Sequence, residues 1–157
     1  MAMRLVAVGT RVPAWVTAGY AEYARRLTGP YRLELTEIPA GHRTRGADLN
    51  RLRREEGERI LGVIPEEAFV VTLDVRGRMR SSEALAQDLG SWLRASRVTF
   101  VIGGAEGLPA ACHERANDSW SLSPLTLPHA LVRVFVAEQL YRAFATLTDK
   151  PYHRAQE

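Results

Sequence analysis

The 157 residues, with 46% hydrophobic and 25% charged side chains, have the composition of one globular domain. The single cysteine, Cys112, excludes a disulfide framework or a thiolate metal cluster within one chain. No apolar run reaches the roughly 18 residues of a membrane span and the start lacks a signal-peptide pattern, which predicts a cytoplasmic protein without membrane contact. The net charge of +3 is uneven: residues 1–60 hold 11 Arg and 7 acidic residues (+4), and residues 61–157 hold 10 basic and 11 acidic residues (−1). The basic half is compatible with nucleic-acid binding or with a biased use of arginine.

The first half of the chain is predicted to alternate strands with helices. Residues 4–8 form a short apolar strand that ends at Gly9, and a helix follows from Pro13. Residues 31–38 alternate apolar with polar side chains, which indicates a strand with one wet face at the edge of a sheet. Asp48 is placed to cap the next helix, which runs to about Leu61 through a charged, solvated face.

The second half continues the alternation. Residues 68–73 and 98–102 are apolar runs suited to strands buried on both faces, and Asp74 and a turn around Gly77 are expected to follow the first of them. Ser81 is placed to cap a helix between these strands. Residues 109–116 form a short helix, residues 120–122 a third brief strand, and residues 128–148 the longest helix.

The longest helix is apolar almost all round, since its apolar residues fall on no single face. A helix on a sheet can hide only one of its sides, so we expect the other to pack against a second copy of the chain in a homodimer. Glu138 and Arg142 are spaced to pair on this helix, and Arg133 points roughly the opposite way.

Each of the three buried strands ends in a loop, after Leu73, Ile102 and Leu122. If the strands are parallel neighbours, these loops line one crevice at their carboxyl ends. Gly103 and Gly104 then either form a flexible turn or bring backbone close to a ligand. Their spacing fits neither the dinucleotide fingerprint nor a P-loop. The pattern predicts a small-molecule site made mostly of backbone and holding no metal.

A basic loop spans residues 39–46 and contains His42, Arg43 and Arg45. It is either a solvated linker or a mobile loop that closes over a phosphate-bearing partner.

Several segments together resemble one family over nearly the whole chain: ribosomal large-subunit methyltransferase H, the small SPOUT-class enzymes that methylate N3 of a pseudouridine in 23S rRNA. Ala155–Glu157 extend beyond the Tyr-His-Arg near which the family's chains end. The segments that carry the resemblance are LVAVG (5–9), EIPAG (37–41), IGGAEG (102–107), WSLSPLTLPH (120–129), LVRV (131–134), AEQLYR (137–142) and PYHR (151–154).

The resemblance implies an α/β fold of the SPOUT type: a knotted (trefoil), mostly parallel sheet with helices on both faces, in a single domain of residues 1–157. It also implies a homodimer and S-adenosylmethionine as cofactor. The residues that correspond to the family's cofactor loops are Leu73, Gly103, Gly104, Leu122, Ser123, Pro124, Leu125, Thr126, Leu127 and Pro128.

Methyl transfer to a ring nitrogen needs aligned reactants and a group that accepts the nitrogen's proton. The candidates for this base are His129, Glu138 and His153. Each also has an ordinary structural interpretation: His129 as a cap or packed residue, Glu138 as the partner of Arg142, and His153 as part of a tail. Candidates for contact with RNA are Arg142 and Arg154 on phosphates, Tyr152 stacked on a base, and His42, Arg43 and Arg45 in the basic loop.

The resemblance implies that the reaction is methylation of pseudouridine 1915 of 23S rRNA on the assembled ribosome. Two alternatives stay open: a non-catalytic ribosome- or RNA-binding assembly factor, and a SPOUT methyltransferase that acts on tRNA. A chain with no appended RNA-binding domain favours a target whose folded surface supplies the specificity.

Overall fold

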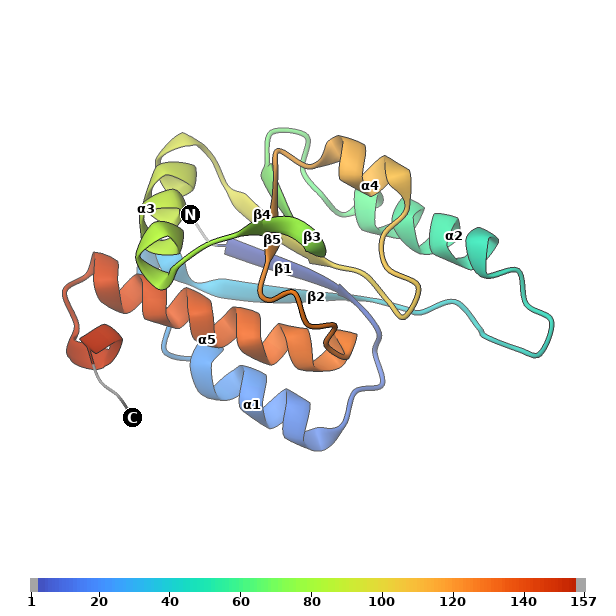
Figure 1. Ribbon diagram of the computed structural model, residues 1–157, viewed down its shortest axis with the longest axis horizontal. Coiled ribbons are helices and arrows are strands. Elements are labelled where there is room, and N and C mark those ends of the chain that lie inside the picture. Colours follow the sequence, from blue (N-terminus) through green and yellow to red (C-terminus); the bar gives the residue numbers. More distant parts are fainter. Residues whose placement is uncertain (1–2, 155–157) are drawn as a thin grey trace.

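The computed structural model describes the backbone of residues 3–154 and the side chains of residues 3–152 (Figure 1). A five-stranded sheet has the order β2-β1-β4-β3-β5, and every neighbouring pair is parallel. The strands are β1 (Met3–Val8), β2 (Leu33–Ile38), β3 (Phe69–Met79), β4 (Val98–Ile102) and β5 (Asp118–Ser121). The helices are α1 (Ala14–Ala24), α2 (Leu49–Gly62), α3 (Ser82–Ala95), α4 (Ala110–Arg115) and α5 (His129–Leu147), with short 3-10 turns at Gly29–Tyr31 and Pro151–Arg154.

Helices cover both faces of the sheet, which confirms the predicted α/β class. One core joins alternate residues of β1 and β4, such as Leu5 and Phe100, to α1, α3 and α5. The other joins the intervening residues, such as Val6 and Val101, to α2 and α4. Figure 1 shows the same two layers on opposite sides of the strands. The trefoil knot stays a prediction.

Two of the three central strands, β1 and β4, follow the sequence pattern closely. All five residues of β4 are buried, as expected for a strand covered on both faces. Asp48 and Ser81 cap α2 and α3 through hydrogen bonds from the backbone N–H groups of Arg51 and Ala84, as predicted.

Among the described residues, none of the helices combines the length and the apolar character that a membrane span requires.

The edge strand differs from its prediction. Tyr31 belongs to a 3-10 turn, and β2 begins only at Leu33. Leu35 is 36% exposed, although the alternation placed it on the covered face with Leu33. An edge strand lies at the border of the helix layer, so only part of its apolar side is covered.

The strand predicted to end at Leu73 continues to Met79, so the expected turn around Gly77 is wrong. Leu73 and Arg78 both pair with Trp120, which means that the residues between them form a bulge inside the strand. A Cβ on Gly77 would lie 2.8 Å from Trp120 N, so this close pairing requires glycine. β5 covers residues 118–121 instead of 120–122, and its first two residues are only half-buried.

Candidate functional site

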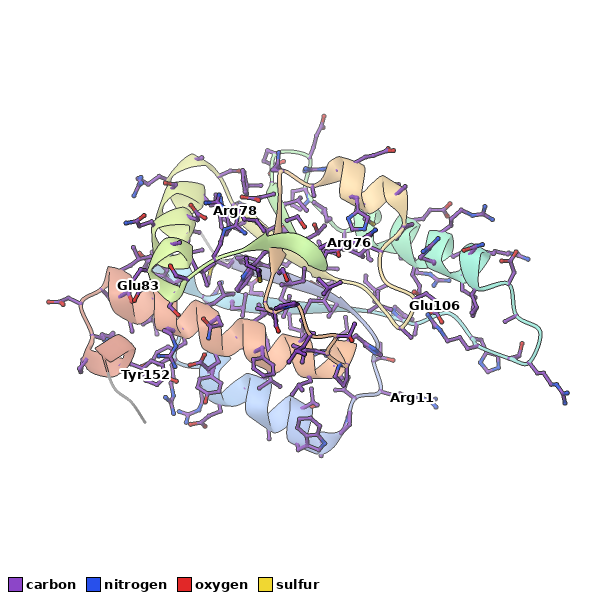
Figure 2. The ribbon with its side chains drawn as sticks, viewed as in Figure 1. Arg11, Arg76, Arg78, Glu83, Glu106 and Tyr152 are labelled. Carbon is purple, nitrogen blue, oxygen red and sulfur yellow. The ribbon has the colours of Figure 1, made fainter. Side chains whose placement is uncertain are left out.

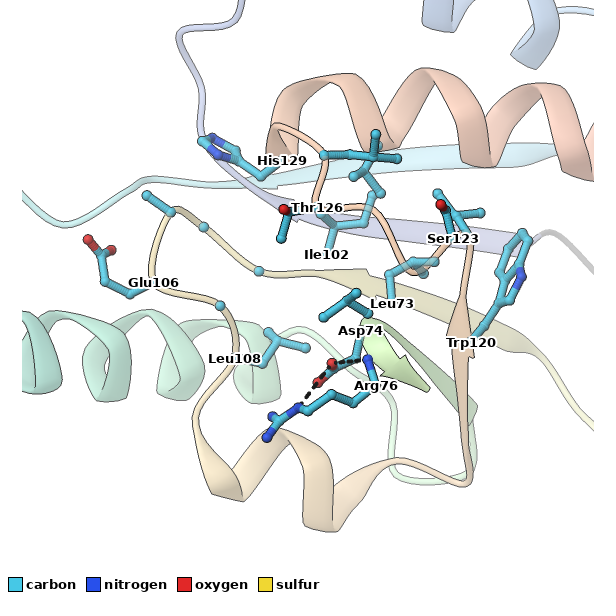
Figure 3. A pocket seen from close by; sticks show the side chains of 18 of the residues that line it. Leu73, Asp74, Arg76, Ile102, Glu106, Leu108, Trp120, Ser123, Thr126 and His129 are labelled. Atoms are coloured by element: carbon cyan, nitrogen blue, oxygen red, sulfur yellow. Dashed lines mark hydrogen bonds and ion pairs between the residues drawn. The ribbon is translucent and has the colours of Figure 1, made fainter. Parts of the chain in front are cut away.

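The three segments predicted to share a crevice do so, although the one after Leu73 is a bulge inside β3 and not a loop at its end. Because β4, β3 and β5 are parallel neighbours, the carboxyl ends of β4 and β5 and the bulge of β3 meet at one edge of the sheet. They enclose a cavity of about 330 Å³ that the amino end of α5 closes (Figure 3). Its lining consists of Arg53, Leu73, Asp74, Val75, Arg76, Ile102, Gly103, Gly104, Ala105, Glu106, Gly107, Leu108, His113, Trp120, Leu122, Ser123, Leu125, Thr126, Leu127, His129 and Val132.

All but two of the residues assigned to the cofactor loops line this cavity; Pro124 and Pro128 do not. The segment that contains these prolines is held in shape by short-range hydrogen bonds. Ser121 Oγ donates to the Ser123 carbonyl at 3.0 Å, and Ser123 Oγ accepts from Leu125 N at 3.0 Å. The loop therefore presents a fixed backbone to the cavity.

The glycine segment forms a tight turn. Gly107 N donates to the Gly104 carbonyl at 3.0 Å, and Gly107 has a φ of +76°. A Cβ on Gly103 would lie 2.7 Å from the carbonyl carbon of Gly107, so the turn closes only with glycine at position 103. At Gly104 a Cβ would meet Glu56 Oε1 and Val8 Cγ1, each at 3.1 Å. Glycine at position 104 thus makes room for α2 and β1.

Polar residues that the sequence reasoning missed stand on the α4 side of the cavity. Asp74 Oδ1 accepts from Arg76 N at 2.8 Å, and His113 Nε2 lies 3.4 Å from Asp74 Oδ2. Burial raises the pKa of Asp74, but the hydrogen bonds from Arg76 and the nearby His113 outweigh it and lower that pKa below its usual value. Asp74 follows Leu73 directly, and an acid at the carboxyl end of a buried strand was the available signal. Arg76 is visible only once the bulge is known.

His129 is the one base candidate among the described side chains that lies at the cavity. It is the first residue of α5, and its Nε2 would be 3.9 Å from a Cβ on Gly9, so it also borders the loop after β1. Figure 3 shows His129 and Glu106 at one end of the pocket and Trp120 at the other.

Glu138, Arg142 and Tyr152 form a second cluster, away from the cavity of their own chain. Glu138 Oε2 accepts from Arg142 Nη2 at 2.6 Å, as the spacing predicted, and from the Tyr152 hydroxyl at 2.7 Å. Glu138 comes nine residues after His129, about 13 Å along the helix. Figure 2 shows Tyr152 and Glu106 far apart, on opposite sides of the molecule's centre. The side chains of His153 and Arg154, and residues 155–157, lie outside the described residues.

The Tyr152 ring does not stand free for stacking in this chain. It packs edge-on against Tyr141 with 4.7 Å between ring centroids, and the Arg142 guanidinium carbon lies 4.9 Å from its centroid. Burial and the hydrogen bond to Glu138 raise the pKa of the Tyr152 hydroxyl, which therefore stays protonated.

The basic loop is tied to the glycine turn by one of its three candidate residues. Arg43 Nε donates to Glu106 Oε2 at 2.8 Å, and Arg43 Nη1 lies 3.0 Å from Glu56 Oε2. The hydrogen bonds from Arg43 lower the pKa of the Glu106 carboxyl group. His42 and Arg45 are exposed, and neither lines the cavity.

Comparison with known proteins shows which family this chain belongs to. A family model described as a predicted SPOUT methyltransferase matches residues 1–153. The chain is 51% identical over 155 residues to ribosomal RNA large subunit methyltransferase H of Methylococcus capsulatus, covering 98% of this chain and 100% of the relative. The chain belongs to the ribosomal RNA large subunit methyltransferase H family.

A second member of this family, from Xanthomonas campestris pv. campestris, is 53% identical over 156 residues, which cover 99% of this chain and 100% of the relative. Among solved structures, a probable methylase family protein from Haemophilus influenzae aligns with a TM-score of 0.56 at 15% identity, over 96% of this chain and 69% of the other. That likeness supports the fold alone. By its family, the chain is a methyltransferase of the SPOUT class. The segments around its cavity include IGGAEG (102–107) and WSLSPLTLPH (120–129), which carry the resemblance to that family.

Proposed function

We propose that the chain transfers a methyl group from S-adenosylmethionine to N3 of a pseudouridine in 23S rRNA, on the assembled ribosome in the cytoplasm. The observation that carries this proposal is the cavity between the carboxyl ends of β4 and β5 and the bulge of β3 in a member of a large-subunit methyltransferase family. Its volume of about 330 Å³ falls within the usual range for small-molecule sites.

The residues that line the cavity can supply the apolar and polar contacts that S-adenosylmethionine needs. Leu73, Ile102 and Leu127 supply apolar surface for the adenine ring, and the turns at 103–107 and 122–127 supply backbone N–H and C=O groups for its polar edges. S-adenosylmethionine supplies a methyl group activated by a positively charged sulfur. The cavity lining carries both signs of charge, with Asp74 and Glu106 against Arg53 and Arg76, which suits a ligand that bears a sulfonium, an amino group and a carboxylate.

His129 is the residue that accepts the N3 proton of the pseudouridine. It lines the cavity, and a neutral imidazole has a basicity suited to proton transfer near neutral pH. Glu138 is the weaker candidate, because its carboxylate already accepts hydrogen bonds from Arg142, Gln139 and Tyr152. The role of His153 as a base stays a proposal that rests on the family resemblance.

The active unit is a homodimer in which the carboxyl-terminal cluster of one chain completes the cavity of the other. The Glu138–Arg142–Tyr152 cluster lies too far along α5 to contact the cavity of its own chain. In a dimer, the cluster of one copy can reach the cavity of the other copy. Trp15 on α1 is 61% exposed and Phe135 on α5 is 43% exposed, and these two helices pack together. Exposed aromatic residues on paired helices are suited to an interface between copies.

RNA is held by basic groups around the dimer site. His42 and Arg45 of the basic loop, with Arg142 and Arg154 of the carboxyl-terminal region, contact phosphates, and Tyr152 stacks on a base once it leaves its packing on Tyr141. A small excess of positive charge gives weak and salt-sensitive binding, which cannot select one nucleotide alone. The shape of the assembled particle therefore supplies the specificity.

The test is transfer of a labelled methyl group from S-adenosylmethionine to 70S particles, 50S particles, protein-free 23S rRNA and tRNA, all from cells that lack the protein. The proposal predicts labelled particles with little label on free rRNA or tRNA. Labelling of tRNA would favour the tRNA methyltransferase. Binding to particles without cofactor affinity or transfer would favour the non-catalytic assembly factor.

A further inference from the structure

Arg43 connects a buried carboxylate to the glycine turn. Glu56 on α2 is 1% exposed, and its Oε2 accepts from Gly41 N at 2.8 Å and pairs with Arg43 Nη1 at 3.0 Å. Arg43 also donates from Nη1 to the Gly41 carbonyl at 2.9 Å and from Nε to Glu106 Oε2 at 2.8 Å. One guanidinium thus spans two carboxylates from segments far apart in sequence.

This cluster holds the glycine turn through Glu106, which lies within the turn and lines the cavity. The second oxygen of Glu56, Oε1, lies close beneath the turn, since it would be 3.1 Å from a Cβ on Gly104. This oxygen is buried and has no hydrogen-bond partner among the described residues. Taking Glu56 out of water is costly unless a cation compensates it, so its presence beneath the turn requires Arg43 to stay in place.

Stability of α2 alone does not account for the cluster. Asp48 caps this helix, and Ile60 anchors it in the core beneath β1 and β4. The partners that Arg43 adds lie in the basic loop and in the glycine turn, and the glycine turn lines the cavity. The cluster therefore acts on the shape of the site.

We propose that Arg43, oriented by Glu56, is a positioning residue: through Glu106 it holds the 103–107 turn in the shape that receives the cofactor. The inference rests on the proposed function, since it takes S-adenosylmethionine as the ligand of the turn. It also assigns Arg43 a role apart from His42 and Arg45, which keep exposed side chains for RNA. Lysine cannot replace Arg43, because one ammonium lacks the planar fork that reaches both carboxylates.

The test measures cofactor affinity by calorimetry and methyl transfer to ribosomal particles for Glu106→Gln, Arg43→Gln, Arg43→Lys and the double Gln variant. Each single variant should weaken S-adenosylmethionine binding about tenfold. The double variant should bind the cofactor no more weakly than Arg43→Gln alone, because Arg43→Gln already removes the contact that Glu106→Gln breaks. The Michaelis constant for the cofactor should rise while kcat at saturating cofactor changes little. The control is Arg51→Gln, which breaks the exposed Arg51–Glu55 pair on α2, the helix that also carries Glu56. This change should leave the affinity for S-adenosylmethionine unchanged.

Unchanged cofactor affinity in folded Glu106→Gln would overturn the inference, as would additive losses in the double variant. A lower kcat and lower melting temperature with an unchanged Michaelis constant would reduce the cluster to a support of the fold. If Arg43→Gln does not fold, Glu106→Gln decides, since its side chain is partly exposed and changes by one atom. Failure of the wild-type protein to bind S-adenosylmethionine would instead remove the proposed function, and the inference with it.

Discussion

Arg133 Nη1 lies 2.7 Å from Glu37 Oε2, and this ion pair joins the last helix to the edge strand. Arg133 is 1% exposed, and its Nη2 also donates to the Gly9 carbonyl at 3.2 Å. A buried guanidinium depends on its partner, because burying an unpaired charge is costly. The pair stands next to His129, so it supports the cavity from the β1 side.

Replacing Glu37 with Gln should lower the free energy of unfolding by about 2 kcal/mol, as measured by urea denaturation. The expected loss is smaller than the roughly 3–5 kcal/mol of a fully buried pair, because the Glu37 side chain is 34% exposed. Glu34→Gln on the same strand is the matched control. It breaks an exposed pair with Arg32 and should cost less than about 0.5 kcal/mol. Equal effects of the two changes would contradict the assigned role of Arg133.

Gly103→Ala should weaken S-adenosylmethionine binding by about tenfold or more in calorimetry of the folded protein. The added methyl would lie 2.7 and 2.9 Å from backbone atoms of Gly107, so the turn itself must move. Gly62→Ala is the control, since nothing lies within 4 Å of its Cβ position and alanine favours a helix. Tight binding by Gly103→Ala would show that the closed turn is not needed for the cofactor.

The sequence predicts the order of elements and the loops of the site, because buried strands and caps leave local patterns. The apolar runs at 68–73, 98–102 and 120–122 predict three buried strands whose following segments share a crevice if the strands are parallel neighbours; the strands are parallel neighbours, and those segments line one cavity. The bulge after Leu73 could not be predicted, since it depends on pairing with Trp120, a residue distant in sequence. For the same reason Arg76 and His113 were missed.

Charge pairs between residues far apart in the chain also could not be predicted from the sequence. The spacing of Glu138 and Arg142 along one helix predicts their contact, but nothing local connects Arg43 to Glu56 or Glu106. Arg43 was therefore grouped with His42 and Arg45 as an RNA contact, and its two carboxylate partners came only from the tertiary structure.

Removing residues 152–157 should abolish methyl transfer to ribosomal particles while leaving cofactor affinity largely intact. The reason is that Tyr152 belongs to the cluster on α5 and does not line the cavity of its own chain. Tyr152→Phe, which loses only the hydrogen bond to Glu138, should fall between the truncated and the wild-type protein. Full transfer activity of the truncated protein would refute a role for this region.

Alkaline pH should destabilise the fold through Cys112. Burial raises the pKa of its thiol from 9.0 to about 11. Because the folded pKa is the higher one, the contribution to stability is complete below pH 9 and is lost as pH rises toward 11. The loss should reach about 2–3 kcal/mol, from about 1.4 kcal/mol per pKa unit. Denaturation of wild type and Cys112→Ala across this range should show the extra decline only in wild type; parallel curves would contradict the burial of the thiol.

Mass spectrometry of 23S rRNA decides whether this protein methylates a pseudouridine in that RNA. Nucleotide fragments should be compared from the parent strain, from a strain that lacks this protein, and from that strain supplied with wild-type or Gly103→Ala protein. The account predicts one N3-methylated pseudouridine that disappears with the protein, returns with wild type and stays largely absent with the variant. An unchanged methylation pattern in the strain that lacks the protein would contradict the account.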